Sequence, residues 1–360
     1  MEKVRIGVLG AGRGYRLARA VADVGSIELA AVCDLDEERL AAAGEVFSRT
    51  YTRYEDMLES DDIDAVLVAS PMPLHAEHSI AALEAGKHVL SEVVAATSIE
   101  QCHQLLKAVR EADAKYMFAE NYCYLRSWST VLGMVRAGLF GDVYYGEADQ
   151  LQDFKRGFPP PEKEYNWRTA ELAMRRGHQY ISHNVGPLYQ AMGERVQTVF
   201  CLGSGQHHVD WARADDTCVV LCRTTGGKLI RIRLDFFSSR PDNYLYTGLQ
   251  GTKACYEAPR ATGDEHRVYV DGVTPKGEWQ SLEEYEQYLP GAWKDVSGNG
   301  VAAFDSGARI MLEEFGRCII DDTHPPIDVV DALNMTAPGL MSEVSIEKGG
   351  VPVEVPEFRL

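Results

Sequence analysis

Residues 4–14 read VRIGVLGAGRG, and the order of side chains in this stretch decides the fold of the first part of the chain. VRIGVLG is a short, β-branched and apolar run, which is typical of a buried strand. GAGRG then provides a tight glycine turn, and residues 15–25, YRLARAVADVG, have the pattern of a helix. A strand, a glycine turn and a helix in direct succession predict the first unit of a parallel sheet covered by helices.

The same alternation continues to about residue 122. Further short apolar runs are IELAAVCD (27–34), DAVLVAS (64–70), KHVLSE (87–92) and KYMFAE (115–120). Helical patterns between most of them include LDEERLAAAGEVF (35–47), PLHAEHSIAALEAG (73–86) and SIEQCHQLLKAVREADA (98–114). Strands that are apolar on both faces need cover on both sides. We therefore predict an α/β fold in which residues 1–122 form a Rossmann domain with a doubly wound parallel sheet.

The pattern changes after residue 122, where longer strands dominate. They are DVYYGEADQLQDF (142–154), VQTVFCLG (196–203), DDTCVVLCRTT (215–225) and GKLIRIRLDFF (227–237). A predicted helix at residues 307–321 and a further segment at residues 329–349 follow late in the chain. Residues 123–360 are therefore predicted to form an α+β domain with an open, mainly antiparallel sheet.

Composition restricts the class of partner. The chain has 360 residues, enough for two cores, and 36 basic against 54 acidic side chains give a formal charge of −18. This balance argues against nucleic acid or an anionic membrane surface and favours a small neutral or polar substrate. The sequence shows no leader or membrane span, so we expect a cytoplasmic protein. Of its eight cysteines, the close pair Cys218 and Cys222 is expected to be buried free thiols.

The glycine turn carries the clearest local chemistry. Gly10, Gly12 and Gly14, with Arg13 between them, would present backbone N–H groups to a pyrophosphate. Asp34 ends the second predicted strand, twenty residues past Gly14, where a carboxylate can accept hydrogen bonds from ribose hydroxyls. We predict a dinucleotide site that prefers NAD, because Asp34 would repel a 2′-phosphate. The third glycine is one residue early for the usual spacing, so an ordinary strand-to-helix turn is the alternative.

Other strand ends point to the same edge of the predicted sheet. Ser70 and Pro71 follow one strand, Glu92 follows the next, and Asn121 follows the last. In a doubly wound sheet, ligands bind across the carboxyl ends of the strands. We therefore predict that these residues contact the cofactor, together with His75 at the start of a helix. For His75 the alternative is an ordinary polar residue in the first turn of that helix.

The succession of these motifs resembles a known family. The motifs are, in order, the glycine turn, Asp34, SPMPLHAEHSIAALEAGKHVLSE (70–92), AENYCY (119–124) and PPIDVVDALNMTAPGLMSEVSIEKGGVPVEVPEF (325–358). Together they resemble the glucose–fructose oxidoreductase, inositol dehydrogenase and rhizopine catabolism (Gfo/Idh/MocA) family over almost the whole chain. The resemblance implies a two-domain NAD(P) enzyme that acts on a sugar or polyol, and association as a homodimer or homotetramer through the sheet of the second domain.

A narrower likeness lies within that family. AENYCY, MVRAGLFGDVYYGEADQLQDF (134–154), NWR (166–168) and YISHNVGPLYQAMGERV (180–196) resemble the NAD-dependent glycosidases typified by bacterial α-N-acetylgalactosaminidases. The resemblance implies a tightly bound NAD that oxidises the sugar transiently at C3. The C2 proton becomes acidic, the C1 leaving group is eliminated, water adds, and the reduced cofactor restores the hydroxyl.

The resemblance also implies roles for individual residues. His183 matches the family's catalytic histidine or tyrosine position, and imidazole titrates near neutral pH as a general base should. Glu120, Tyr122 and Tyr124 are further catalytic candidates, and alternation on a strand would aim all three to one side. The alternatives are a hydrogen-bonded histidine beneath the sheet for His183 and simple packing for one of the other three. His178 is expected to be a loop residue.

The remaining candidates concern cofactor and substrate. Trp167 and Arg168 resemble a pair that closes over the cofactor, with a plain surface Trp-Arg stack as the alternative. Gln150 and Gln152 stand where those glycosidases carry a tyrosine and a histidine. Candidate substrate residues are Gln150, Gln152, Tyr180 and Asp305, the last in AAFDSG, which replaces an expected His-Gly-Gly segment.

One departure from the family concerns Glu92. The dehydrogenases of the family carry Glu-Lys-Pro at this strand end, where the lysine helps to move the hydroxyl proton. Here Val93 and Val94 replace lysine and proline, so another group must carry the proton.

Three functional hypotheses remain after these departures. They are a redox glycosidase, an NAD-dependent sugar or polyol dehydrogenase with His183 as proton carrier, and a non-catalytic NAD-binding sensor. We expect no catalytic metal, because the candidate residues lack the spacing of a ligand set.

Overall fold

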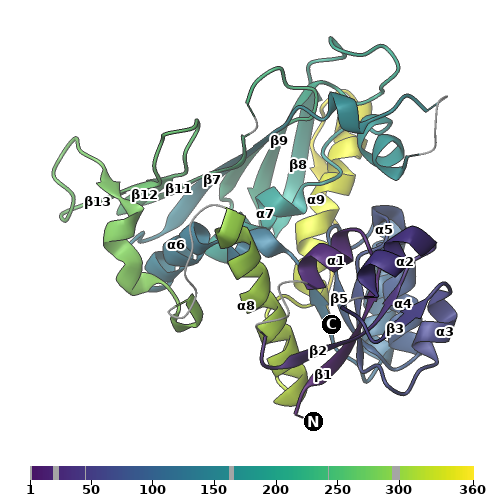
Figure 1. Cartoon of the computed structure of the whole chain (residues 1–360). Helices are drawn as coiled ribbons and strands as arrows, with labels where there is room; N and C mark the ends of the chain where they lie inside the picture. Colours follow the sequence, from purple (N-terminus) through teal and green to yellow (C-terminus); the bar gives the residue numbers. More distant parts are fainter. Residues whose placement is uncertain (1, 19–23, 45, 162–165, 242, 294–300) are drawn as a thin grey trace. The chain divides into compact units, whose positions relative to one another are not determined.

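The computed structural model describes residues 2–18, 24–44, 46–161, 166–241, 243–293 and 301–360; the side chains of residues 156, 244, 245 and 301–306 lie outside that description. The chain divides into two units (Figure 1). The first comprises residues 1–124, 295–333 and 358–360, and the second comprises residues 125–294 and 334–357. The predicted ranges 1–122 and 123–360 stay a prediction for the domain boundaries. The two units differ from those ranges by placing residues 123–124, 295–333 and 358–360 with the first.

Six parallel strands form the sheet of the first unit, in the order β3-β2-β1-β4-β5-β6. They are β1 (Val4–Leu9), β2 (Ile27–Cys33), β3 (Arg49–Tyr51), β4 (Ala65–Val68), β5 (His88–Ser91) and β6 (Tyr116–Phe118). This is the strand order of a doubly wound Rossmann sheet, which confirms the predicted fold. The order reverses between β1 and β4, so the segments after these two strands flank the crevice in which such sheets bind ligands.

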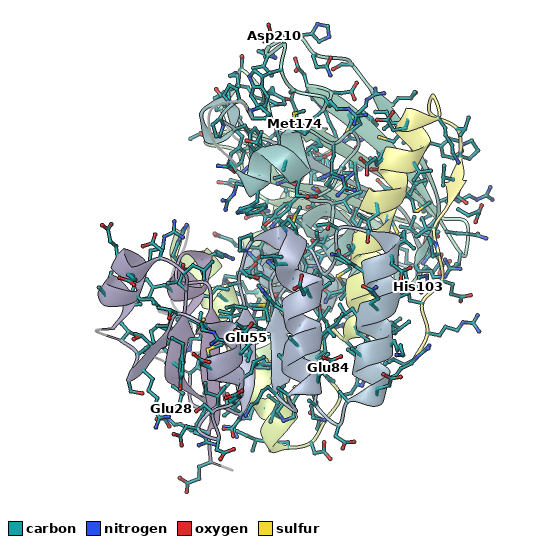
Figure 2. All side chains as sticks on the ribbon, turned by 90° about the vertical axis from the view of Figure 1, so that its right-hand side faces the viewer. Glu28, Glu55, Glu84, His103, Met174 and Asp210 are labelled. Atoms are coloured by element: carbon teal, nitrogen blue, oxygen red, sulfur yellow. The ribbon has the colours of Figure 1, made fainter. Side chains whose placement is uncertain are left out.

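The helices of the first unit cover this sheet. They are α1 (Arg13–Ala18), α2 (Glu37–Ala43), α3 (Tyr54–Leu58), α4 (His75–Glu84), α5 (Ile99–Glu111) and α8 (Val301–Ile320). Helices α4 and α5 lie side by side, marked by Glu84 and His103 in Figure 2, and α8 packs against β1 and β2. Side chains of Asp36 and Ser98 accept hydrogen bonds from backbone N–H groups in the first turns of α2 and α5 and so fix where these helices begin.

Nine strands form the sheet of the second unit, in the order β14-β13-β12-β11-β7-β10-β9-β8-β15. They are β7 (Val143–Leu151), β8 (Val196–Gly203), β9 (Thr217–Thr224), β10 (Leu229–Asp235), β11 (Asn243–Gly251), β12 (Ala254–Glu257), β13 (Arg267–Val270), β14 (Gln280–Ser281) and β15 (Val353–Glu354). Strands β7 and β10 pair in parallel, and the other described pairs are antiparallel. The predicted open, mainly antiparallel sheet is confirmed.

Helix α7 (Ser182–Met192) packs on one face of this sheet, against β7. Gly146 permits the close approach, because a Cβ there would lie 2.7 Å from Leu188 Cδ2 and 2.9 Å from Met192 Cε. The same sheet buries Cys218 and Cys222 as free thiols, as predicted. The remaining longer helices are α6 (Arg126–Arg136) and α9 (Val329–Glu347). No helix in the described ranges has the length and hydropathy to cross a bilayer.

Candidate functional site

The three glycines after β1 have three different steric roles. Gly10 has φ 102°, and a Cβ there would clash with the carbonyl oxygen of Ala69 after β4. At Gly14 a Cβ would lie 2.5 Å from Val8 Cγ1, so this glycine lets α1 pack closely on the sheet. The nearest atom to a Cβ at Gly12 would be 3.8 Å away, which leaves its backbone open to a phosphate. These are the roles expected of a dinucleotide-binding turn, and Gly14 performs the third of them.

Asp34 holds this turn in place. Its Oδ2 accepts a hydrogen bond of 2.7 Å from the N–H of Ala11, and its Oδ1 accepts one of 2.9 Å from the N–H of Asp36. Each carboxylate oxygen has room for a second donor, so ribose hydroxyls can be accepted as well. The residues therefore fit an NAD site, and Asp34 couples the end of β2 to the glycine turn.

Replacement of Asp34 by a neutral residue is expected to weaken the preference for NAD over NADP. Asp34→Asn keeps an acceptor for the Ala11 N–H but removes the negative charge, whereas Asp34→Ala removes both. We expect Kd for NAD to rise about 10- to 100-fold in the alanine variant, the value of one or two hydrogen bonds to a charged group. Kd for NADP should fall in both variants, because the repulsion of a 2′-phosphate disappears. Calorimetric titration with both cofactors measures the ratio of Kd for NADP to Kd for NAD. If this ratio were the same in the variants and the wild type, Asp34 would not determine the choice of cofactor.

His75 connects the segments that follow β4 and β5. Its Nδ1 lies 2.9 Å from the carbonyl oxygen of Val94, and its Nε2 lies 2.8 Å from that of Ser70. Burial lowers the pKa of His75, so the ring is neutral at pH 7 and donates to one of the two carbonyls at a time. His75 thus positions two strand ends, while Pro71 is exposed on the rim. Direct contact of Ser70, Pro71 or His75 with the cofactor stays a prediction.

Glu92, directly after β5, has its cationic partner in the glycine turn. Arg13 Nε donates to Glu92 Oε1 over 2.7 Å, and the Glu92 side chain is only 6% exposed. Sequence reasoning selected both residues for the cofactor but missed their pairing, because 79 positions separate them. The ion pair joins the glycine turn to the end of β5.

Asn121 offers a buried, unmatched amide after β6. The residue is 3% exposed, and neither its Oδ1 nor its Nδ2 has a hydrogen-bond partner among the described residues. A buried amide without partners is destabilising by about 1 to 3 kcal/mol. A ligand group with both a donor and an acceptor, such as a carboxamide or a ribose hydroxyl, would satisfy it, which supports Asn121 as a cofactor contact.

The segment with the three catalytic candidates of the first unit is not a strand. Strand β6 ends at Phe118, and Asn121–Tyr124 forms a 3₁₀ helix, η3, so the predicted alternation of Glu120, Tyr122 and Tyr124 was wrong. Fully buried Glu120 accepts from the N–H of Tyr122 at 3.2 Å, a bond that bends the chain into the helix. This local side-chain acceptor competes with the extended conformation.

Tyr124 is linked to helix α8. Its hydroxyl donates to Glu314 Oε2 over 2.8 Å. Burial and the neighbouring carboxylate raise the pKa of Tyr124 well above its usual value, so this phenol holds its proton. The contact favours a packing role for Tyr124, and catalytic roles for Glu120 and Tyr122 stay predictions.

His183, the predicted proton carrier, lies in the first turn of α7 in the second unit. His183 is 8% exposed and meets the ring of Tyr180 edge-on, with 5.0 Å between ring centroids. His178 does lie in an irregular segment, but it is fully buried, and its Nε2 lies 2.8 Å from Asn184 Oδ1. Desolvation lowers the pKa of His178 to about 3, with a smaller contribution from nearby His183. Sequence reasoning missed this neutral histidine because nothing in the local pattern signals its burial.

Two other predicted pairs are in contact. Gln150 Nε2 donates to Gln152 Oε1 over 3.3 Å, and Gln150 Oε1 is buried without a partner among the described residues. The guanidinium of Arg168 stacks on the Trp167 ring, 4.3 Å from its centroid. This is the stack given as the alternative, and contact of the pair with the cofactor stays a prediction. The side chain of Asp305 lies outside the described residues.

The comparisons with known proteins agree with this geometry. Residues 4–120 match the model of the oxidoreductase family with an NAD-binding Rossmann fold, and residues 196–359 match that of the glycosyl hydrolase 109 C-terminal domain. A glycosyl hydrolase family 109 protein of Solibacter usitatus is 30% identical, over 99% of this chain and 88% of its own length. The chain belongs to glycosyl hydrolase family 109. The resemblance to the NAD-dependent glycosidases is thereby confirmed, and this family 109 chain is an NAD-dependent enzyme.

Two further proteins are similar to this family 109 chain. An alpha-N-acetylgalactosaminidase of Shewanella oneidensis is 27% identical over 99% of this chain and 85% of that protein. Levoglucosan dehydrogenase, solved with NADH and levoglucosan, superposes with a TM-score of 0.83 at 20% identity, over 99% of this chain and 100% of that one. At that identity the structural likeness shows the fold alone.

Proposed function

We propose that this protein is a glycosidase that uses NAD as a retained redox cofactor. One observation carries the proposal: a single chain joins an NAD-binding Rossmann domain to a glycosyl hydrolase 109 C-terminal domain. Cleavage of a glycosidic bond by water consumes no oxidant. A redox cofactor in such an enzyme must therefore return to its starting state within each turnover, and it has no reason to leave. We accordingly infer that NAD is tightly bound.

The first unit would hold the cofactor. The glycine turn would bind the pyrophosphate, Asp34 the adenosine ribose, Glu92 the nicotinamide ribose, and the unmatched amide of Asn121 a polar group near that end. Bound NAD would supply a hydride acceptor and, later in the same turnover, a hydride donor. The protein's own contribution is position, charge and proton transfer.

His183 would move the proton. A group must take the proton of the sugar's 3-hydroxyl when the adjacent C–H is oxidised, and Val93 and Val94 cannot do so. Imidazole exchanges protons near neutral pH, and the Tyr180 ring packs edge-on against that of His183. Tyr180, Gln150 and Gln152 would bind sugar hydroxyls, with the free Oε1 of Gln150 available to accept from one of them.

The test separates this function from a simple dehydrogenase. The purified protein is denatured, the released cofactor is identified, and the native protein is screened with nitrophenyl glycosides, N-acetylhexosaminides first, while NADH absorbance is followed. We expect one NAD per chain and nitrophenol release without accumulation of NADH. NADH that grows in step with substrate would identify a sugar or polyol dehydrogenase. Bound cofactor without any product would identify a sensor.

We also infer that the protein is cytoplasmic and forms a homodimer or homotetramer. All eight cysteines are free, and seven of them are buried, which fits a reducing compartment. One face of the second sheet exposes Phe200, Leu202, Leu221 and Leu229, interspersed with the arginines Arg223 and Arg231. Exposed apolar side chains on a sheet face support self-association, and light scattering after size-exclusion chromatography measures the oligomeric state.

A further inference from the structure

A second group of reactive side chains lies at one end of the sheet in the second unit. His208 and Asp216 belong to the loop between β8 and β9, residues 204–216, and Ser239 follows β10. Asp210, at the outer edge of the unit in Figure 2, marks this loop. His208 Nδ1 lies 2.7 Å from Asp216 Oδ2, and His208 Nε2 lies 3.1 Å from Ser239 Oγ. One imidazole thus bridges a carboxylate and a hydroxyl.

The hydrogen-bonding capacity of each group sets the direction of these contacts. Lys155 Nζ lies 3.0 Å from Ser239 Oγ, and an ammonium can only donate, so the serine oxygen accepts from it. The carboxylate of Asp216 can only accept, so in its neutral form His208 carries its hydrogen on Nδ1. Nε2 is then an acceptor, and the single hydroxyl hydrogen of Ser239 is directed to it. This is the arrangement in which a serine is activated as a nucleophile.

Solvent exposure increases from Asp216 to His208 and Ser239. The Asp216 side chain is 6% exposed, whereas His208 is 36% exposed and Ser239 is open to solvent. The N–H of His207 donates to Asp216 Oδ2 as well, over 2.9 Å, which fixes the carboxylate. A buried acid therefore orients the histidine, and a substrate can reach the hydroxyl.

The base of the loop is anchored independently. Arg176 makes two contacts with the buried carboxylate of Asp215, at 2.9 and 3.0 Å. Asp215 Oδ1 also accepts from the N–H of Gly205 over 2.8 Å. Charge-assisted, bidentate contacts of this kind restrict the loop and hold His208 toward Ser239.

We propose that Ser239, His208 and Asp216 form a nucleophilic triad that hydrolyses short-chain carboxylic esters. The proposal goes beyond the glycosidase function and does not depend on it, since it uses none of the residues assigned to cofactor or sugar. Ser239 and His208 would be catalytic residues, and Asp216 a positioning residue that acts through His208.

The proposed chemistry balances with water as the co-reactant. Ser239 Oγ attacks the ester carbonyl carbon while its proton passes to His208 Nε2. The C–O bond to the alcohol breaks, the alcohol leaves with that proton, and the acyl group remains on Ser239. Water then attacks the acyl carbon, gives a proton to His208, and releases the carboxylic acid and the free serine. The ammonium of Lys155 stabilises negative charge that develops on oxygen beside Ser239.

The direct test is covalent labelling of the full chain. A fluorophosphonate probe reacts with activated serines, so we expect one adduct per chain, on the peptide that contains Ser239, and slow turnover of p-nitrophenyl acetate. Ser239→Ala should abolish both. Ser48→Ala is the matched control, because Ser48 is an exposed hydroxyl in the first unit that donates to a backbone carbonyl.

Two variants test the rest of the triad. Asp216→Asn should lower kcat for p-nitrophenyl acetate by about 10³- to 10⁴-fold with little change in KM, because it presents the wrong tautomer of the histidine. His208→Ala should be as inactive as Ser239→Ala. Absence of an adduct on Ser239 in the folded protein, or equal ester turnover by Ser239→Ala and wild type, overturns the proposal. Cofactor content and glycoside cleavage are measured on the same samples, so failure of either function is seen separately.

Discussion

Replacement of His183 by alanine is expected to lower kcat for glycoside cleavage by about 10²- to 10⁴-fold, the usual contribution of a general acid or base. The reason is that proton transfer at the sugar would lose its carrier while the valines after Glu92 supply none. NAD should stay bound, since every residue that we assign to the Rossmann turn lies in the first unit and is untouched. The measurement combines kcat on a nitrophenyl glycoside with cofactor content after denaturation.

The control for this variant is His324→Ala, because the His324 side chain is 70% exposed and pairs with Asp328 at the surface of the first unit. Tyr124→Phe is a second comparison. It removes the hydroxyl that donates to Glu314, so it should lower stability more than kcat. If His183→Ala cleaved the glycoside at the wild-type rate, His183 would be a packing residue and the proton carrier would have to be sought elsewhere.

Buried His178 is expected to make the protein sensitive to mild acid. Its folded-state pKa is about 3, because burial penalises the charged ring, whereas an unfolded histidine titrates near about 6.5. The unfolded chain therefore binds more protons below pH 6.5. The stabilising contribution is complete above that pH and is lost as pH falls toward 3. Between pH 7 and pH 4.5 the loss from this one residue is about 3 kcal/mol.

Chemical denaturation at the two pH values tests this expectation. His178→Gln keeps an amide that can donate to Asn184 but does not titrate, so its free energy of unfolding should change less between pH 7 and pH 4.5 than that of the wild type. His324→Gln is the matched control, since an exposed histidine should leave the difference unchanged. An equal loss in wild type and His178→Gln would show that His178 is protonated in the folded protein or does not control the acid limb.

Local patterns predicted most of the fold. Residues 196–203 are predicted as a strand, and β8 has those limits. The helix predicted at residues 98–114 is α5, capped by Ser98. Such elements depend on neighbours within a few positions, which a sequence displays directly. The predicted strand alternation of Glu120, Tyr122 and Tyr124 was wrong because the buried carboxylate of Glu120 accepts a hydrogen bond from the backbone of Tyr122. No periodicity in the sequence reveals this bond.

The candidate site was less accessible from the sequence. The glycine turn and Asp34 could be found, because their spacing is itself the signal. The Arg13–Glu92 pair, the buried His178 and the contact of His208 with Ser239 could not, because each depends on tertiary packing that brings separate segments together. Exposure, which distinguishes an inert histidine from a reactive one, is likewise a property of the folded chain.

The Arg13–Glu92 pair has an evolutionary consequence. The dehydrogenases that this chain resembles follow the glutamate with lysine, whereas here the cation comes from the glycine turn and Val93 is 3% exposed. Val93→Lys alone would bring a second cation to a carboxylate that already has one, in a place with little water. Arg13 lost alone would leave a buried, unpaired carboxylate. Interconversion of the two designs therefore requires two coordinated substitutions, and a lineage that has adopted either one is separated from the other by a less stable intermediate.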